Sequence, residues 1–192
     1  MTVPTRVVVG ISGASGALLG IRIVEVLVAA ECETHLVVSR RGERTMDHEA
    51  GADAIQRLRS IATCWHPIDN VGATIASGSF RTAGMIVAPC SMRSLSAIAS
   101  SAADNLLVRA ADVHLKERRP LVLLTRETPL HLGHIRLMAA ATEIGAIIAP
   151  PVPAYYRRPQ SVAEIIEHTA RRAIDLLKLD IPALAEPWDG LA

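Results

Sequence analysis

The chain has 192 residues, a formal net charge of +1, and a composition that is 50% hydrophobic but only 3% aromatic. A charge this close to zero gives no argument for nucleic acid or an anionic membrane as a partner. With so few rings, Ala, Val, Leu and Ile must fill the core, which is typical of one domain with a buried parallel sheet under helices.

Three cysteines, at positions 32, 64 and 90, are too few and too widely spaced for a disulfide framework, which favours the reducing cytoplasm. The N-terminal segment has no charged leader before its apolar run, so we expect no signal peptide. No apolar run reaches the roughly 18 residues that a membrane-spanning helix requires. We therefore expect a cytoplasmic protein without a membrane partner.

The first half of the chain is expected to alternate strands with helices. In order we predict a strand at 6–11, a helix at 16–30, a strand at 33–39, one or two helices within 44–60, a turn at 76–80 and a strand at 84–90 that Pro89 stops. The strands at 6–11 and 84–90 are almost continuous apolar runs, as buried parallel strands are.

The second half continues the alternation. We predict two helical pieces within 91–119, a strand at 120–125, a helix at 130–145, a short strand at 146–150, a proline-rich loop at 150–160 and a helix at 162–178. Ser161 and Glu164 form a capping box for that last helix. The pattern indicates an α/β fold: a single-domain, doubly wound, Rossmann-like parallel sheet over 1–178, followed by an irregular tail at 179–192.

Sheets of this kind bind ligands at the carboxyl ends of their strands, near the switch in strand order. Four segments should therefore meet there: residues 12–16, 39–41, 89–94 and 125–127. The first three carry serines just beyond a strand. Backbone N–H groups at helix starts, together with hydroxyls, suit a phosphate monoester or a flavin ring.

The first of these segments belongs to a glycine-rich loop, GISGASGALLG at 10–20. Its spacing, G-x-x-G-x-x-G, differs from the G-x-G-x-x-G of dinucleotide binders, and no Lys-Ser/Thr follows to make a P-loop. The strand at 33–39 leads into two arginines rather than the acidic residue that holds an NAD ribose. An NADP enzyme with those arginines on a 2′-phosphate therefore stays an alternative, as does a tight turn that binds nothing.

Several longer stretches resemble the flavin prenyltransferase (UbiX) family. They are GISGASGA, ASGSFRTAGMIVAPCSM, DNLLVRAADVHLKERRPLVLLTRETPLHLGHIRLM, GAIIAPPVPAYYRRPQS and the late Trp188. The resemblance runs over about residues 6–178, dense at 75–160 and loose at 40–70. The segment PCSMRS is similar to the subgroup found beside hydroxyarylic acid decarboxylases.

The resemblance implies a flavodoxin-like fold that binds FMN. It implies a metal-independent enzyme that joins a dimethylallyl group, from dimethylallyl monophosphate or diphosphate, to N5 and then C6 of reduced FMN. The product, prenylated FMN, would serve a UbiD-type decarboxylase. The family is usually a homododecamer with active sites between subunits.

The matching positions imply roles for particular residues. Ser15 and Glu49 would handle protons around the flavin N5, and Glu127 would act as acid/base at the leaving phosphate. FMN contacts would come from Gly13, Ala14, Ser15, Ser39, Ser91, Met92, Arg93, Ser94, Arg109 and Arg126, and donor contacts from Lys116, Arg126, Tyr156, Arg172 and Trp188. Glu49 departs from the family pattern in its neighbours, because the chain reads HEA where members often read ETD.

The residues themselves support part of this picture. Mg²⁺-dependent prenyl-diphosphate enzymes need clustered aspartates, which are missing here, so cations must hold the phosphate. The candidates are Lys116, Arg126, Arg157, Arg158 and Arg172. Tyr156 and Trp188 offer π faces to an allylic cation.

Simpler roles stay open for several of these side chains. Ser15 can be a helix cap, Glu127 a structural partner of Arg126, Trp188 a plug in a subunit contact, and any single cation a solvated surface charge. We expect Cys90 to be a small buried spacer. We expect no metal site, because His131 and His134 lack a third and fourth ligand.

Two other functions compete. FMN-dependent cysteine decarboxylases usually carry a PASANT-type segment and a catalytic histidine, whereas this chain reads PCSMRS and has no histidine between 67 and 113. A non-catalytic FMN carrier, or an assembly subunit of a hydroxyarylic acid decarboxylase, is the other alternative.

Overall fold

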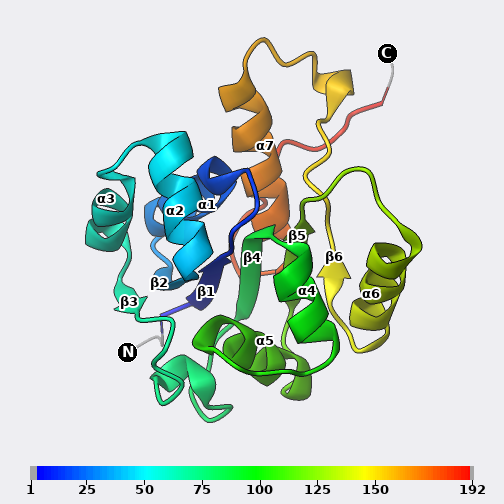
Figure 1. Cartoon of the computed structure of the whole chain (residues 1–192). Helices are drawn as coiled ribbons and strands as arrows, with labels where there is room; N and C mark the ends of the chain where they lie inside the picture. Colours follow the sequence, from blue (N-terminus) through cyan, green and yellow to red (C-terminus); the bar gives the residue numbers. More distant parts are fainter. Residues whose placement is uncertain (1–3, 191–192) are drawn as a thin grey trace.

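The computed structural model describes residues 4–190, which form one six-stranded parallel sheet (Figure 1). The strands, in spatial order, are β3 (Cys64–His66), β2 (Glu33–Val38), β1 (Arg6–Ile11), β4 (Gly84–Cys90), β5 (Leu121–Thr125) and β6 (Ile147–Ile148). Each neighbouring pair is parallel. The order reverses between β1 and β4, so the predicted doubly wound sheet is confirmed.

Helices cover both faces of this sheet (Figure 1). One core cluster joins the sheet to α1 (Ala17–Ala29), α2 (Arg40–Ala50), α3 (Ala54–Ile61) and α7 (Val162–Asp175). The other joins it to α4 (Met92–Ala99), α5 (Leu106–Lys116) and α6 (Leu132–Glu143). Two short 3₁₀ turns, η1 (Thr74–Ala76) and η2 (Tyr155–Arg157), lie in the connections.

The central strand β1 is buried on both faces, as its continuous apolar run predicts. Val7 and Val9 pack in the α1 cluster while Val8 packs in the α5 cluster. The helix α1 lies so close to β4 that a Cβ on Gly20 would stand 2.3 Å from the carbonyl oxygen of Ala88. Glycine is therefore needed there for close approach rather than for flexibility.

Two predictions about the strands were wrong. The strand β3 was missed, because three residues are too few to show an alternating pattern; pairing with β2 holds it instead. Pro89 does not stop β4, which continues to Cys90 across a shift in register between Val87 and Cys90. A proline is accommodated where the ladder is already irregular.

The predicted helices are confirmed in kind, with shifted ends. The run at 44–60 forms two helices, and the first begins at Arg40 because Ser39 caps it. The last helix ends at Asp175, short of residue 178. The carboxylate of Asp175 accepts hydrogen bonds from the backbone N–H groups of Leu184 and Ala185, at 2.8 and 3.0 Å, so the start of the tail is held against α7. The division at residue 178 stays a prediction.

Among residues 4–190, no helix has the length and apolar content needed to cross a bilayer. The three cysteines Cys32, Cys64 and Cys90 are all free thiols, as their spacing predicted.

Candidate functional site

The loops after β1, β2 and β4 are tied together by hydrogen bonds at the carboxyl edge of the sheet. The Ser12 hydroxyl donates to the carbonyl oxygen of Pro89 at 2.8 Å and accepts from the N–H of Ser91 at 2.7 Å. The N–H of Ser39 donates to the carbonyl oxygen of Ile11 at 2.9 Å. The predicted meeting of these segments is confirmed, and sequence reasoning had given Ser12, which bridges two of them, no role.

The serines after β2 and β4 begin helices. Ser39 caps α2 by accepting from the N–H of Gly42 at 3.0 Å, and Ser91 caps α4 by accepting from the N–H of Ser94 at 3.3 Å. Ser94 is buried and Ser91 half-buried. Two helix N-termini therefore point their partial positive charge at the same edge, which suits an anionic ligand.

The glycine-rich loop passes very close to the start of α2. A Cβ on Gly13 would lie 2.4 Å from the Cβ of Arg41, so no larger residue fits without a backbone shift. Ala14 is half-buried beside it, and Ser15 is exposed at the tip of the loop. A backbone without a side chain can approach a flat ligand closely at this point.

Glu49 lies at the N-terminus of α1, although its sequence neighbours differ from the family pattern. Its carboxylate accepts from the N–H of Gly16 at 3.1 and 3.0 Å and from the N–H of Ala17 at 2.8 Å. The cap position of α1 is Gly16, with a φ of 107° and no side-chain cap, so Ser15 does not cap this helix. Ser15 and Glu49 line one groove of about 450 Å³ together with Pro151.

The fourth segment follows β5 and joins the same edge. The N–H of Arg126 donates to the carbonyl oxygen of Cys90 at 3.1 Å. The side chains of Arg126 and Glu127 are exposed, and no ion pair joins them within the described residues. Glu127 accepts from the N–H of Thr128 at 3.0 Å, and in the described part of the chain its carboxylate makes no contact with Arg126.

Two buried groups lie directly under this edge. Cys90 is fully buried, and burial raises the pKa of its thiol to about 12, so it is a protonated spacer rather than a nucleophile at neutral pH. The hydroxyl of Thr125, at the last position of β5, is buried and has no hydrogen-bond partner among residues 4–190. A buried hydroxyl at a ligand-binding edge gains its missing hydrogen bond when a ligand or water contacts it.

Tyr156 and Trp188 lie against each other, although 32 positions separate them in the chain. Their rings meet edge to face, with centroids 4.9 Å apart and an interplanar angle of 76°. Both side chains are exposed, on η2 and on the tail. Nearby, Arg157, one of the candidate phosphate-binding cations, pairs with Glu186.

Other predicted contacts do not join the carboxyl edge within one chain. On α5, Arg109 donates to the carbonyl oxygen of Ala76 at 3.2 Å and pairs with Asp112, and Lys116 pairs with Glu117 at 2.6 Å. Lys116 comes just before the amino end of β5, at the edge of the sheet opposite Arg126.

The remaining predicted contacts are Arg93, Met92 and Arg172, and Arg158 is the remaining candidate cation. The guanidinium of Arg93 pairs with Asp104 beyond α4, while Met92 stays half-buried at the start of that helix. Arg172 is exposed in the last turn of α7, and Arg158 is exposed after η2.

The pair His131 and His134 is structural. Nδ1 of His131 accepts from the N–H of Gly133 at 3.0 Å and so caps α6, and the two rings stack at 3.6 Å. A different set of metal-ligand side chains, His35, Cys64 and His66, comes together across β2 and β3. Sequence reasoning missed that set because it missed β3.

Comparisons with known proteins give this geometry a family context. A family described as Flavoprotein matches residues 1–155. The flavin prenyltransferase UbiX of Thauera aromatica is 55% identical over 185 residues, 96% of this chain and 94% of that protein. The crystal structure of AnUbiX (PadA1) in complex with FMN and dimethylallyl pyrophosphate superposes with a TM-score of 0.94 at 44% identity, covering 99% of this chain and all of that one. A dodecameric FMN-dependent UbiX-like decarboxylase from Escherichia coli O157:H7 gives a TM-score of 0.91 at 41% identity, covering 97% and 100%.

Proposed function

Because the chain belongs to the UbiX family of flavin prenyltransferases, we propose that it transfers a dimethylallyl group from dimethylallyl monophosphate to N5 and C6 of reduced FMN. The prenylated FMN is then released to a UbiD-type decarboxylase. The observation that carries this function is the convergence of four loops at one edge of the sheet, with Glu127 and Arg126 exposed there and no ion pair between them.

The residues at this edge fit FMN. Gly13 leaves the backbone open where a Cβ would collide, the N-termini of α2 and α4 favour a phosphate, and the Thr125 hydroxyl lacks a partner. Gly13 to Ser15, Ser39, Ser91 to Ser94 and Arg126 would hold the cofactor. Reduced FMN supplies the nucleophilic nitrogen when bound.

The chain's own residues supply binding and proton transfer. Glu127 delivers a proton to the phosphate oxygen that departs from the allylic carbon. Arg126 neutralises part of the phosphate charge, as a guanidinium does well. The faces of Tyr156 and Trp188 stabilise positive charge on the allyl group as it leaves.

Ser15 and Glu49 act at the flavin rather than at the donor phosphate. Glu49 fixes the loop that carries Ser15, because its carboxylate accepts from the N–H groups of Gly16 and Ala17. The exposed Ser15 hydroxyl is then free to take the proton that N5 loses, with Glu49 as the nearby acceptor.

Arg109, as an FMN contact, and Lys116, as a donor contact, would reach the active site from a neighbouring copy of the chain. Arg172, exposed in the last turn of α7, would be a further donor contact. Within one chain, the two residues on α5 lie at the amino edge of the sheet, away from Arg126. A homo-oligomer, proposed here as a dodecamer like the similar Escherichia coli protein, brings that edge of one subunit to the carboxyl edge of another. The three free cysteines agree with the cytoplasm as its location.

One incubation tests the function. The full chain is mixed with reduced FMN and dimethylallyl monophosphate, and the released flavin is weighed by mass spectrometry. We expect a flavin heavier by one prenyl unit, and a parallel reaction with the diphosphate ranks the two donors. Unchanged flavin from FMN-loaded protein would instead indicate a carrier, and decarboxylation of a cysteinyl peptide would indicate the other alternative.

The acid/base assignment has its own control. Glu127→Gln removes the proton while keeping the shape, whereas Glu143→Gln changes an exposed glutamate at the end of α6. We expect the first variant to lose turnover by about 10²–10⁴-fold and the second to keep it. Full activity in Glu127→Gln would remove that residue from the chemistry.

A further inference from the structure

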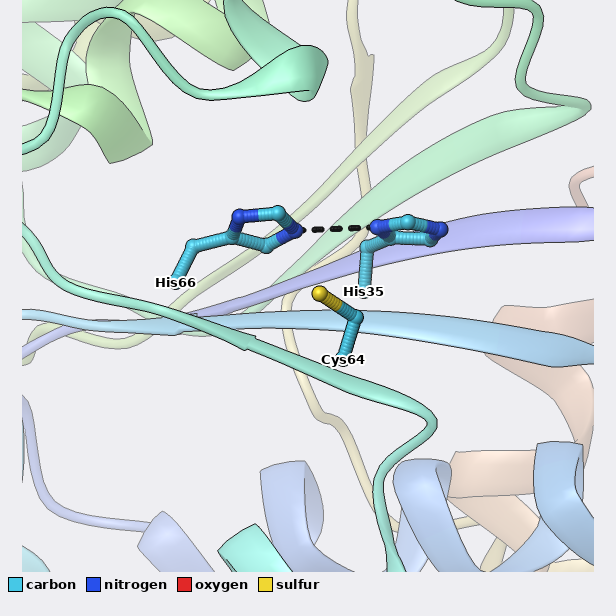
Figure 2. Close-up of side chains that lie close together, drawn as sticks. All are labelled: His35, Cys64 and His66. Carbon is cyan, nitrogen blue, oxygen red and sulfur yellow. Dashed lines mark hydrogen bonds between the residues drawn. The ribbon is translucent and has the colours of Figure 1, made fainter.

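Three metal-ligand side chains meet at the β2–β3 edge of the sheet, away from the flavin edge. His35 lies on β2, and Cys64 and His66 lie on β3, two positions apart and therefore on the same face. The parallel register sets His35 beside Cys64 and Val37 beside His66. Figure 2 shows the two imidazoles pointing at each other and the Cys64 sulfur directed toward the gap between them.

The ligand atoms are already close. Nδ1 of His35 and Nε2 of His66 are 2.9 Å apart, and these atoms and the Cys64 Sγ all lie within 4.8 Å of one another. Zinc binds nitrogen at about 2.0–2.1 Å and sulfur at about 2.3 Å in a tetrahedron, which sets neighbouring ligand atoms roughly 3.3–3.6 Å apart. The 2.9 Å between the two nitrogens is slightly shorter than this separation, and the 4.8 Å limit on the other distances exceeds it by about 1.2 Å.

A carboxylate orients the first imidazole. Nε2 of His35 lies 2.9 Å from Oε1 of Glu33, and the same oxygen accepts from Nε of Arg6 at 3.0 Å. A carboxylate beside Nε2 holds the proton there, so Nδ1 presents its lone pair to His66 and Cys64. Metal-binding histidines characteristically donate their other ring nitrogen to a carboxylate in this way.

The surroundings favour a fixed site rather than a chance contact. His35 and His66 are buried, and the edge of the Phe80 ring meets His35 with centroids 5.0 Å apart. Cys64 is half-buried, which leaves a way in for an ion and a fourth position for water. We propose that His35, Cys64 and His66 bind one divalent ion of the zinc class, with Glu33 as the positioning residue of His35.

The site would fasten the edge of the sheet. Among residues 4–190, the strand β3 has only three residues and pairs with β2 alone, so an ion that bridges the two strands adds a link where only three residue pairs join this edge strand to the sheet. The set lies in register with His35 to Val37 of β2, whereas the flavin edge begins beyond Val38. The proposal is therefore independent of prenyl transfer, and its test measures no turnover.

Zinc and cobalt titrations of the chelator-treated full chain provide the test. We expect one Zn²⁺ per chain after dialysis, and a thiolate-to-cobalt charge-transfer band with tetrahedral d–d bands when Co²⁺ is added. Cys64→Ser should remove the charge-transfer band and lower zinc affinity by at least roughly 100-fold, while Glu33→Gln should lower it by about tenfold. Cys32→Ser, at a buried cysteine outside the set, is the matched control and should change neither.

A second measurement needs no variant. In the unmodified chain, Zn²⁺ should slow alkylation of Cys64 at least tenfold, read by mass spectrometry of its peptide, because a metal-bound thiolate is no longer free to react. Failure to retain zinc, retention unchanged in Cys64→Ser, or equal alkylation with and without zinc would each overturn the proposal and leave a hydrogen-bonded histidine pair.

Discussion

The proposed active site has a flavin half and a donor half, and one chain assembles the flavin half more fully than the donor half. At the carboxyl edge of the sheet, loops are locked by hydrogen bonds such as Ser12 to Pro89, and the groups on offer are backbone N–H groups and short hydroxyls. Apart from Arg126, the donor half consists of long side chains on α5, η2, α7 and the tail. Of these, Tyr156 and Trp188 meet within the described part of one chain.

The difference follows from what each ligand needs. A flavin is held by backbone geometry, which a strand–loop–helix unit builds locally. A metal-free allylic phosphate needs several full charges, and a monomer that gathered them without a ligand would suffer mutual repulsion. Under this proposal, cations left on a separate edge, as Lys116 is, would come together when subunits assemble.

Mixed oligomers give the largest expected effect on this comparison. Glu127→Gln and Lys116→Ala should each abolish most activity, by about 10²–10⁴-fold for the acid. If the two residues serve one site from different chains, coexpression of both variants should restore roughly a quarter of the sites, as random assembly dictates. Turnover of the purified mixture is the measurement, and a mixture as inactive as either parent would place both residues on the same chain.

A substitution at Gly13 tests the FMN-binding loop without changing the donor half of the site. Gly13→Ala sets a Cβ 2.4 Å from that of Arg41, so the loop must move away from its position. We expect FMN affinity, measured by quenching of flavin fluorescence, to fall at least about tenfold, with a cost in stability of roughly 1–3 kcal/mol. Gly72→Ala is the control, because its Cβ would meet its nearest neighbour at 3.7 Å. Equal FMN affinities for Gly13→Ala and Gly72→Ala would contradict close contact between the Gly13 backbone and FMN.

Substitution of the aromatic pair Tyr156 and Trp188 should lower kcat/KM for the donor and leave FMN affinity unchanged. Trp188→Ala removes a cation–π interaction worth about 0.5–2 kcal/mol. We therefore expect kcat/KM for dimethylallyl monophosphate to fall roughly 2–30-fold. Trp188→Phe should keep most of the rate, since it keeps a π face. Tyr155→Ala, at an exposed ring next to Tyr156, is the control. A loss of FMN affinity in Trp188→Ala would instead assign the tail to the flavin.

The parts of this molecule that sequence predicts are those set by local pattern. The strand–glycine–helix unit at 6–29 follows from periodicity. The sequence places Ser39 and Ser91 just beyond their strands, but it did not predict that Ser39 caps a helix beginning at Arg40. The contact of Glu49 with the α1 N-terminus joins residues 33 positions apart; family resemblance paired Glu49 with Ser15 but did not indicate this contact. The set of His35, Cys64 and His66 depends on the register of a three-residue strand, which no local pattern reveals.

The smallest effect on turnover is expected from His114, which anchors α5. Its Nδ1 donates to the carbonyl oxygen of Ala110 at 2.7 Å, and its Nε2 accepts from the hydroxyl of Thr82 at 2.9 Å. Burial first, and the nearby Arg119 to a smaller extent, lower the pKa of His114 from 6.5 to about 4. The folded ring therefore stays neutral at pH 7, and His114→Gln, which keeps an amide donor and acceptor, should leave turnover nearly unchanged there.

The same residue should matter when the pH falls. Between pH 6.5 and 4, His114 is protonated in the unfolded chain but stays neutral in the folded chain. The contribution of His114 to the free energy of unfolding is therefore fully present above pH 6.5 and is lost as the pH falls toward 4. The loss amounts to roughly 3 kcal/mol of unfolding free energy for the fully shifted group. Urea unfolding of both proteins across this range measures it, and the difference between their slopes isolates His114 from the other histidines whose pKa burial lowers, His66 and His168. Parallel curves for the two proteins would show that α5 is held by its apolar face alone, and that the cations it carries are positioned without this anchor.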